Sequence, residues 1–174
     1  MGITYQRPKE YKDGDDLFYG YTATVFANME DMKSIIGYVY LVAGGAVTWR
    51  SKKQVIIVLL STEAEYITLL EAAREACWLR NIYDELGFTQ LFLMILKGDN
   101  DGSISMAENP QFHQRSKHIV ICYHWIWELV KDNHIVIESC HNPEQTADVL
   151  MKVLPRAKFT WHREEIGVRA KFTQ

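Results

Sequence analysis

The amino-acid sequence predicts a single α/β domain in which helices cover a mixed β-sheet. Three strand-like segments come first, and two more follow singly among helical segments, an order typical of a mixed sheet. The chain has 174 residues, a length that suits one domain with a sizeable core. Its 48% apolar and 24% charged residues indicate a globular protein rather than a disordered one.

The first half of the predicted sheet is a group of three consecutive strands, which follows a polar leader over residues 1–16. We expect these strands at residues 17–26, 37–42 and 46–50. Gly44-Gly45 is a plausible hairpin turn between the second and the third strand. The β-branched run at 55–58 fits either a buried strand or the approach to a helix, and the sequence leaves both open.

The longest predicted helix covers residues 62–86, because apolar residues recur there at helical spacing and Gly87 suits the position after a helix end. The later elements alternate between helices and strands. We expect strands at 91–97 and 134–140, and helices at 103–107, 119–131, 144–154 and 156–166. Residues 17–167 then form the domain, and 168–174 form a tail.

Bulk properties exclude some classes of protein. The formal net charge of −3 argues weakly against a protein that holds nucleic acid through its overall charge. Three cysteines lie far apart without a Cys-x-x-Cys pair, so we expect neither a zinc site nor a disulfide framework. The N-terminus lacks a signal peptide, and the longest apolar run is too short to span a bilayer. We expect an intracellular protein of the cytoplasm or nucleus, without a membrane partner.

Several short motifs carry a resemblance to a known family. They include Trp49 to Gln54, Ser61 to Tyr66, Glu71 to Arg80, His113 to Ile119 and Gln145 to Asp148. In their order and spacing, they resemble the ribonuclease H domain of copia-type retrotransposon polyproteins, over nearly the whole chain. The resemblance implies a ribonuclease H-like fold with a mixed five-stranded sheet. It also implies an ancestral enzyme that cuts the RNA strand of RNA–DNA hybrids with two Mg²⁺ ions, here as a degenerate, standalone copy.

The same resemblance indicates a missing metal ligand. The family motif Gly-Tyr-Ser-Asp-Ala-Asp-Trp-Ala reads Gly-Tyr-Thr-Ala-Thr-Val-Phe-Ala at residues 20–27. Ala23 therefore stands at the position of the first catalytic Asp, which is expected to contact both metal ions. The resemblance assigns the remaining acids of the metal site to Glu65, Asp99 and Asp148. We therefore expect weak or absent Mg²⁺ binding and an inactive or weak enzyme.

Each remaining acid also has an explanation without a metal. Glu65 fits the third position of a helix capped by Thr62, Asp99 fits a turn, and Asp148 fits a solvent-facing helix position. With the resemblance, a site role becomes the preferred interpretation. The alternative to an impaired protein is a weakly active Mg²⁺-dependent nuclease that uses these three acids, with Asp101 as an additional ligand.

Two further groups of residues are candidates for binding. The resemblance implies that Arg115, Lys117 and His118 approach the backbone of a hybrid, since basic side chains suit phosphate contacts. Taken alone, they fit an ordinary solvated loop. Tyr123, Trp125 and Trp127 lie on the next predicted helix, where they form either a surface for a protein partner or part of the core. The present role expected for the chain is that of a protein- or nucleic-acid-binding module.

Overall fold

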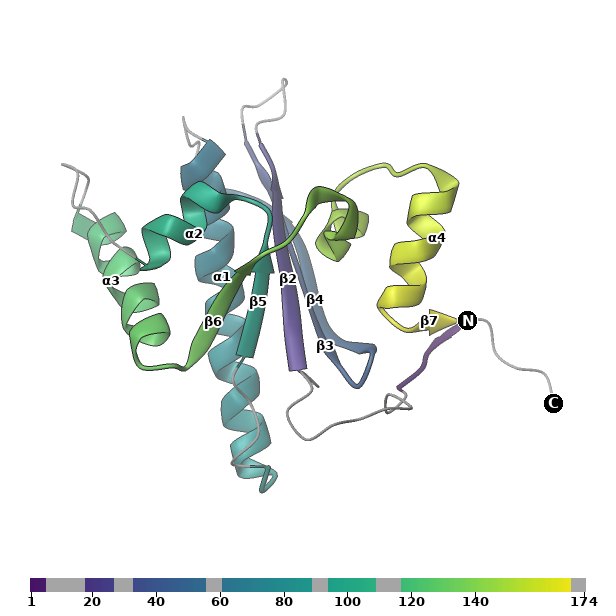
Figure 1. Ribbon diagram of the computed structural model, residues 1–174, viewed down its shortest axis with the longest axis horizontal. Coiled ribbons are helices and arrows are strands. Elements are labelled where there is room, and N and C mark those ends of the chain that lie inside the picture. Colours follow the sequence, from purple (N-terminus) through teal and green to yellow (C-terminus); the bar gives the residue numbers. More distant parts are fainter. Residues whose placement is uncertain (6–17, 27–32, 56–60, 89–93, 109–116, 170–174) are drawn as a thin grey trace.

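The protein is represented by a computed structural model that describes residues 1–5, 18–26, 33–55, 61–88, 94–108 and 117–169 (Figure 1). The strands are β1 (Gly2–Ile3), β2 (Phe18–Val25), β3 (Ile35–Val42), β4 (Gly45–Lys53), β5 (Met94–Gly98), β6 (Ile135–Ser139) and β7 (Val168–Arg169). The α-helices are α1 (Ser61–Glu85), α2 (Asp101–Glu108), α3 (Lys117–Lys131) and α4 (Arg156–Glu165). Two short 3-10 helices, η1 (Asn142–Glu144) and η2 (Thr146–Leu150), precede α4.

The main sheet has five strands in the order β4-β3-β2-β5-β6. β2, β3 and β4 form an antiparallel meander, whereas β5 pairs in parallel with both β2 and β6. The predicted mixed five-stranded sheet with flanking helices is thus confirmed. Consecutive strands that pair in parallel require a long connection, and α2 and α3 lie in the one between β5 and β6.

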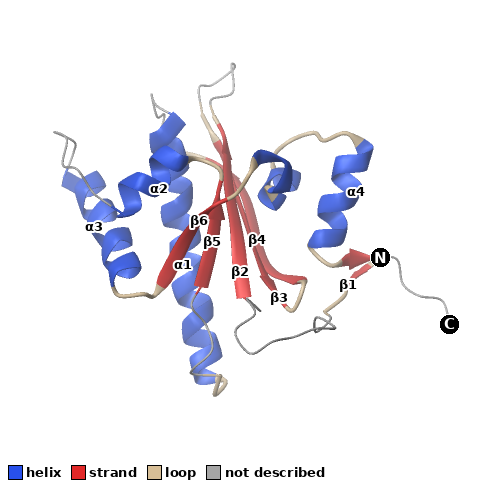
Figure 2. Cartoon of the chain, in the orientation of Figure 1, coloured by secondary structure: helices blue, strands red, loops and turns tan. Residues whose placement is uncertain are grey.

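Helices cover both faces of this sheet (Figures 1 and 2). α1, α2 and α3 lie on one face, and η2 with α4 lies on the other. Side chains along β2 alternate between the faces, as a strand requires. Phe18 packs into the larger apolar cluster under α1, whereas Tyr21 and Ala23 belong to the smaller cluster under η2.

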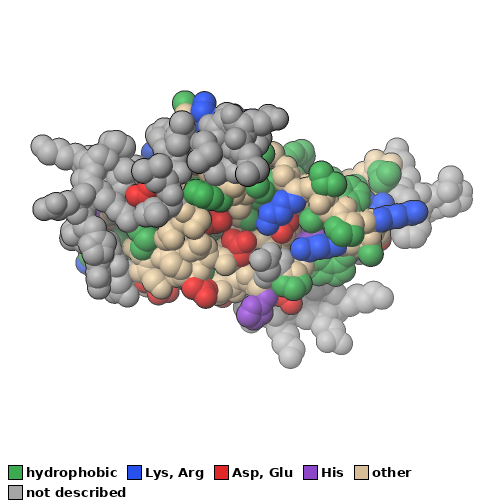
Figure 3. All heavy atoms as spheres, turned by 90° about the horizontal axis from the view of Figure 1, so that it is seen from above, with side chains coloured by type: hydrophobic (Ala, Val, Ile, Leu, Met, Phe, Trp, Pro, Cys, Tyr) green, Lys and Arg blue, Asp and Glu red, His purple; other side chains and the backbone are tan. Residues whose placement is uncertain are grey.

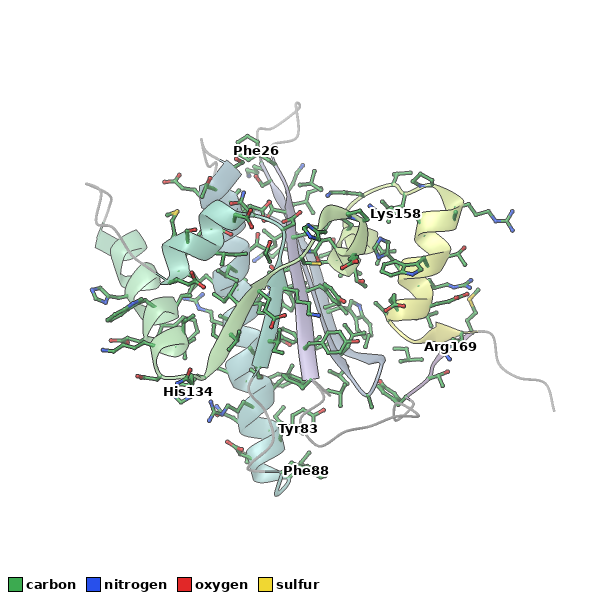
Figure 4. The ribbon with its side chains drawn as sticks, viewed as in Figure 1. Phe26, Tyr83, Phe88, His134, Lys158 and Arg169 are labelled. Carbon is green, nitrogen blue, oxygen red and sulfur yellow. The ribbon has the colours of Figure 1, made fainter. Side chains whose placement is uncertain are left out.

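The predicted end of the long helix is confirmed in detail. Gly87 has a φ of 85°, and its N–H donates to the carbonyl of Asp84 at 3.0 Å. The N–H of Phe88 donates to the carbonyl of Tyr83 at 2.9 Å, which completes a Schellman motif. The Tyr83 and Phe88 rings meet edge to face with centroids 6.2 Å apart, at the free end of α1 (Figure 4).

The turn between β3 and β4 lies one residue earlier than predicted. Ala43 and Gly44 are its two central residues, with φ values of 49° and 70°, while Gly45 already belongs to β4. Positive φ at both central residues is the mark of the hairpin turn that matches strand twist. A side chain at Gly45 would collide with the Tyr5 ring, because its Cβ would lie 2.5 Å from that ring.

The helix predicted at 144–154 is wrong. Residues 142–150 form the two 3-10 turns η1 and η2, and α4 follows Pro155 as predicted. Side-chain hydrogen bonds explain the difference, because buried Gln145 accepts from the N–H of Ala147 at 3.4 Å instead of continuing a helix.

Parts of several predicted segments lie outside the described residues: most of 1–16, residue 17 of the first strand, all of 55–58 except Val55, the start of 91–97 and most of 168–174. A second, two-stranded sheet was not predicted, and it joins Gly2–Ile3 to Val168–Arg169 in antiparallel register. No helix in the described ranges is long and apolar enough to cross a membrane.

Candidate functional site

The candidate site lies where the carboxyl ends of β2 and β5 meet the start of α1 and the 3-10 helix η2. The parallel pairing of β2 with β5 ends at Thr22 and Gly98. The Gln145 amide Nε2 then donates to the carbonyl of Thr22 at 3.0 Å and to that of Lys97 at 3.4 Å. Since Gln145 is fully buried, these bonds fasten η2 to the sheet next to the strand ends.

Ala23 lies on the η2 face of β2 and is completely buried. It pairs across the sheet with Gly37, and the Met151 side chain packs over this small pair of residues. A Cβ added to Gly37 would lie 2.7 Å from Met151 Sδ. The position that the sequence resemblance assigns to a catalytic Asp is therefore apolar and is covered by the thioether of Met151.

On the opposite face of β2, buried hydroxyl and amide groups hold the first turns of α1 against the sheet. Thr24 Oγ1 is hydrogen-bonded to Thr68 Oγ1, which donates to the Ala64 carbonyl at 2.9 Å. Gln54 Nε2 donates to the same carbonyl at 3.1 Å. These contacts fix the position of the helix turn from which the side chain of the next residue, Glu65, extends.

Glu65 is partly buried, and its environment opposes ionisation. Burial and, second, the charge of Asp99 raise the pKa of Glu65 to about 8, while Thr24 and Lys152 act in the opposite direction. α1 begins at Ser61, which places Thr62 inside the helix rather than at its cap. The capping explanation of Glu65 therefore does not fit the observed helix start.

Asp99 follows β5 and is partly buried. Burial raises its pKa, the Lys152 ammonium opposes this shift, and Asp148 adds to it. Asp99 Oδ1 is buried and has no hydrogen-bond partner among the described residues. Its neighbours have structural tasks: Asn100 Oδ1 accepts the Ser103 N–H at 2.9 Å and so caps α2, while Asp101 Oδ1 accepts from Ser139 Oγ at 2.8 Å.

Asp148 is 1% exposed, so it is not the solvent-facing helix residue of the alternative explanation. Its two carboxylate oxygens each face a lysine. Lys152 Nζ lies 2.7 Å from Oδ1, and Lys158 Nζ lies 3.9 Å from Oδ2. No hydrogen bond of ordinary geometry reaches Oδ1 within the described part of the chain, so the contact with Lys152 is an ion pair. Figure 4 shows Lys158 between α4 and η2.

His162 is also fully buried on this side of the sheet. Its Nδ1 lies 3.4 Å from the Thr146 hydroxyl oxygen, which joins α4 to η2. Burial and the charge of Lys158 lower the pKa of His162, and Asp148 opposes this shift. A neutral imidazole is thus favoured beside the lysines.

Two of the predicted acids, Glu65 and Asp99, have the same charged neighbours. Asp148 raises and Lys152 lowers the pKa of both Glu65 and Asp99. We call these four residues the acid–lysine cluster. In the view from above, acidic side chains and Lys or Arg side chains lie next to each other near the centre of this face (Figure 3). No group of three or more His, Cys, Asp or Glu residues within the described ranges is arranged to hold a metal ion.

The residues present do not fit a two-metal centre. Two hard cations each need several oxygen ligands. Ala23 supplies no oxygen, and the carboxylate of Asp148 already faces two ammonium groups. Asp99 Oδ1 is buried and accepts no hydrogen bond from any described residue.

The predicted binding residues that the structure describes lie on α3. Arg115 lies outside the described residues, and Lys117 and His118 begin α3. Trp125 of α3 packs against the larger apolar cluster. The partly buried ring of Trp127 lies under Lys131 Nζ, which is 4.8 Å from its centroid. Tyr123 is on the same helix.

Sequence reasoning missed Met151, Lys152 and Lys158. A signal for Lys152 was available, because Asp148 and Lys152 have the i,i+4 spacing of a helical ion pair. The backbone holds the two residues one helical turn apart, since the Lys152 N–H donates to the Asp148 carbonyl at 2.9 Å. For Met151 and Lys158, the sequence holds no comparable signal.

Comparison with known proteins yields clear relatives, although no family model matches the chain. The chain is 37% identical over 157 residues, or 90% of its length, to the retrovirus-related Pol polyprotein from transposon TNT 1-94 of Nicotiana tabacum. It is 34% identical over 139 residues, or 80% of its length, to the Pol polyprotein from transposon RE1 of Arabidopsis thaliana. It spans only 12% and 10% of the length of these two relatives.

Solved structures share the fold. The ribonuclease H1 LC11, isolated from compost by a metagenomic approach, matches with a TM-score of 0.55 at 16% identity, over 78% of this chain and 92% of that chain. A structure of the same enzyme in complex with an RNA/DNA hybrid matches with a TM-score of 0.54 at 16% identity, over 76% and 92%. The predicted ribonuclease H-like fold is thereby confirmed.

Proposed function

We propose that this chain, which belongs to the family of retrovirus-related Pol polyproteins of transposons, is a ribonuclease H-like domain that binds RNA–DNA hybrids but does not cleave them. One observation carries the proposal. The position expected to bridge two metal ions is Ala23, which is fully buried beside Gly37 and covered by Met151. An alanine has no oxygen, and neither neighbour supplies one.

The proposal of hybrid binding rests on the family and on the fold. The LC11 ribonuclease H1 was crystallised with an RNA/DNA hybrid, and this chain shares its fold over most of its length. Loss of metal ligands removes charge stabilisation of the transition state but leaves contacts with the sugar–phosphate backbone in place. A protein partner on α3 has less support, because Trp125 packs on the core and Trp127 contacts Lys131.

A labelled RNA–DNA hybrid tests both parts of the proposal. With Mg²⁺ or Mn²⁺ present, we expect no cleavage above the level of a buffer blank. Fluorescence anisotropy should report binding that weakens as salt rises, because contacts with phosphates release counterions. Double-stranded DNA of the same sequence is the specificity control. Equal affinity for both duplexes would contradict a preference for hybrids.

A weakly active nuclease is the second candidate, and one observation favours it. Asp99 Oδ1 is buried without a hydrogen-bond partner in the described part of the chain, which leaves an oxygen available to a cation. If the preparation cleaves the hybrid, Asp99→Asn decides the origin of the activity. Loss of cleavage in this variant would establish the weak nuclease and overturn our proposal, whereas unchanged cleavage would indicate a contaminating enzyme.

A further inference from the structure

The buried carboxylate of Asp148 is already neutralised by side chains of this chain. Its side chain is 2% exposed, and a buried charge is strongly unfavourable unless a partner compensates it. Lys152 and Lys158 provide that partner, with their side chains 33% and 34% exposed. Both lysines therefore extend from the surface, with their ammonium groups directed at a carboxylate that solvent hardly reaches.

Three contacts place Lys152 beside the strand ends. Gln145 fastens the start of η2 to the carbonyls of Thr22 and Lys97. Met151, the residue immediately before Lys152, packs over the pair of Ala23 and Gly37 and is thus anchored on the sheet. The backbone bond from Lys152 to Asp148 closes the turn. The backbone position from which the Lys152 side chain reaches Asp148 is consequently set by the fold.

We propose that Lys152 is the resident cation of the acid–lysine cluster, so that its ammonium group takes the place of a divalent metal ion and the folded chain needs none. The inference deepens the proposed function and rests on it. It adds a second reason for lost metal binding, because an ammonium group next to Asp148 repels a dication in addition to the missing oxygen at Ala23.

Thermal unfolding of the whole chain tests this role without any cleavage assay. We expect the same Tm for the unmodified protein in chelator and in Mn²⁺. Lys152→Met should lower the Tm in chelator by roughly 10 °C, since it leaves a buried carboxylate without its nearest cation. Mn²⁺ should restore part of that loss in Lys152→Met, because the ammonium group nearest to Asp148 is gone and only the more distant Lys158, 3.9 Å from Oδ2, still opposes the dication.

Three further variants keep the result interpretable. Lys52→Met removes a lysine from the exposed end of β4 and should leave the Tm nearly unchanged. Lys152→Arg keeps the cation and should retain a Tm that does not respond to Mn²⁺. The double variant Asp148→Asn with Lys152→Met removes both partners and should be more stable than Lys152→Met alone. This double variant also serves if Lys152→Met does not fold.

The proposal is overturned if Mn²⁺ raises the Tm of the unmodified protein as much as that of Lys152→Met, or if Lys152→Met is as stable as Lys52→Met. These readouts separate it from the proposed function. Hybrid cleavage lost in Asp99→Asn would contradict the impaired enzyme. Mn²⁺ stabilisation of the unmodified chain without cleavage would contradict only the role of Lys152.

Discussion

At the scale of single residues, the acid–lysine cluster holds acids whose charges repel each other. Lys152 relieves part of that repulsion. Glu65 bears the largest consequence, with a pKa raised from its ordinary 4.5 to about 8. The groups that act on it come from separate elements: Asp99 follows β5, while Asp148 and Lys152 belong to the η2 segment. Ionising Glu65 therefore costs free energy in the folded state that the unfolded chain does not pay.

The pH dependence of stability follows from this shift. In the folded state Glu65 holds its proton up to about pH 8, whereas in the unfolded chain it loses the proton near 4.5. Between these values the folded state binds more protons, so the contribution of Glu65 to stability is fully present below the lower value and is lost as pH rises towards the higher one.

We predict that Glu65→Gln, which mimics the protonated acid, removes this loss. Chemical denaturation at a series of pH values, in the presence of a chelator, measures the difference between variant and parent. As pH rises from 5 to 8, the free energy of unfolding of the variant minus that of the parent should increase. Glu63→Gln is the matched control on the same helix turn, because Glu63 is a first-turn acid. A constant difference across the series would contradict the shifted pKa.

At the scale of elements, the C-terminal end of α1 allows the effect of backbone conformation on stability to be measured separately from crowding. Gly87 has a φ of 85°, and a Cβ added there would meet no atom within 4 Å. Gly87→Ala therefore changes backbone strain without crowding. We predict a loss of about 1 kcal/mol in the free energy of unfolding, seen as a Tm decrease of roughly 2–4 °C.

Gly2→Ala is the matched control for this substitution. A Cβ at Gly2 also has nothing within 4 Å, but Gly2 lies in β1 and has no positive φ. Its Tm should stay within about 1 °C of the parent, since an exposed strand residue without contacts contributes little. Equal losses in both variants would mean that the Schellman geometry does not limit the residue at 87.

The elements that the sequence predicted well are those whose pattern is local. Helical spacing and Gly87 locate α1, and alternation with a small turn locates the hairpin of β3 and β4. The prediction of an α-helix at 144–154 failed because the form of η2 depends on hydrogen bonds from Gln145 to strands more than forty residues away in sequence. The acids of the site could be named from a family motif, but the pairing of Asp148 with Lys158 depends on how α4 folds back.

At the scale of the whole molecule, one junction connects the small β1–β7 sheet to the main sheet. The N–H of Thr4 donates to the carbonyl of Gly167 at 2.8 Å, and the N–H of Ala46 donates to the carbonyl of Ile166 at 3.1 Å. β1, β4, α4 and β7 therefore meet around Gly167, whose φ is 78°. β7 follows α4 directly, and α4 contacts η2 through Lys158 and His162.

We predict that Gly167→Ala costs more stability than Gly87→Ala, although both glycines have a positive φ. A Cβ at Gly167 would lie 2.8 Å from the carbonyl oxygens of Gly44 and Thr4, and these backbone atoms cannot move aside as a flexible side chain would. Crowding adds roughly 1–3 kcal/mol to the strain of the left-handed conformation. Denaturant titration of the two variants side by side measures the difference.

The same variant should reveal which parts depend on the junction. If the β1–β7 sheet opens, α4 loses its hold on η2 while the cluster under α1 stays packed. Hydrogen exchange should then speed up in α4 and β7 but stay slow in α1 and β5. Faster exchange throughout the chain would show that the junction supports the whole fold, and unchanged exchange in α4 would show that η2 holds this helix without help from the β1–β7 sheet.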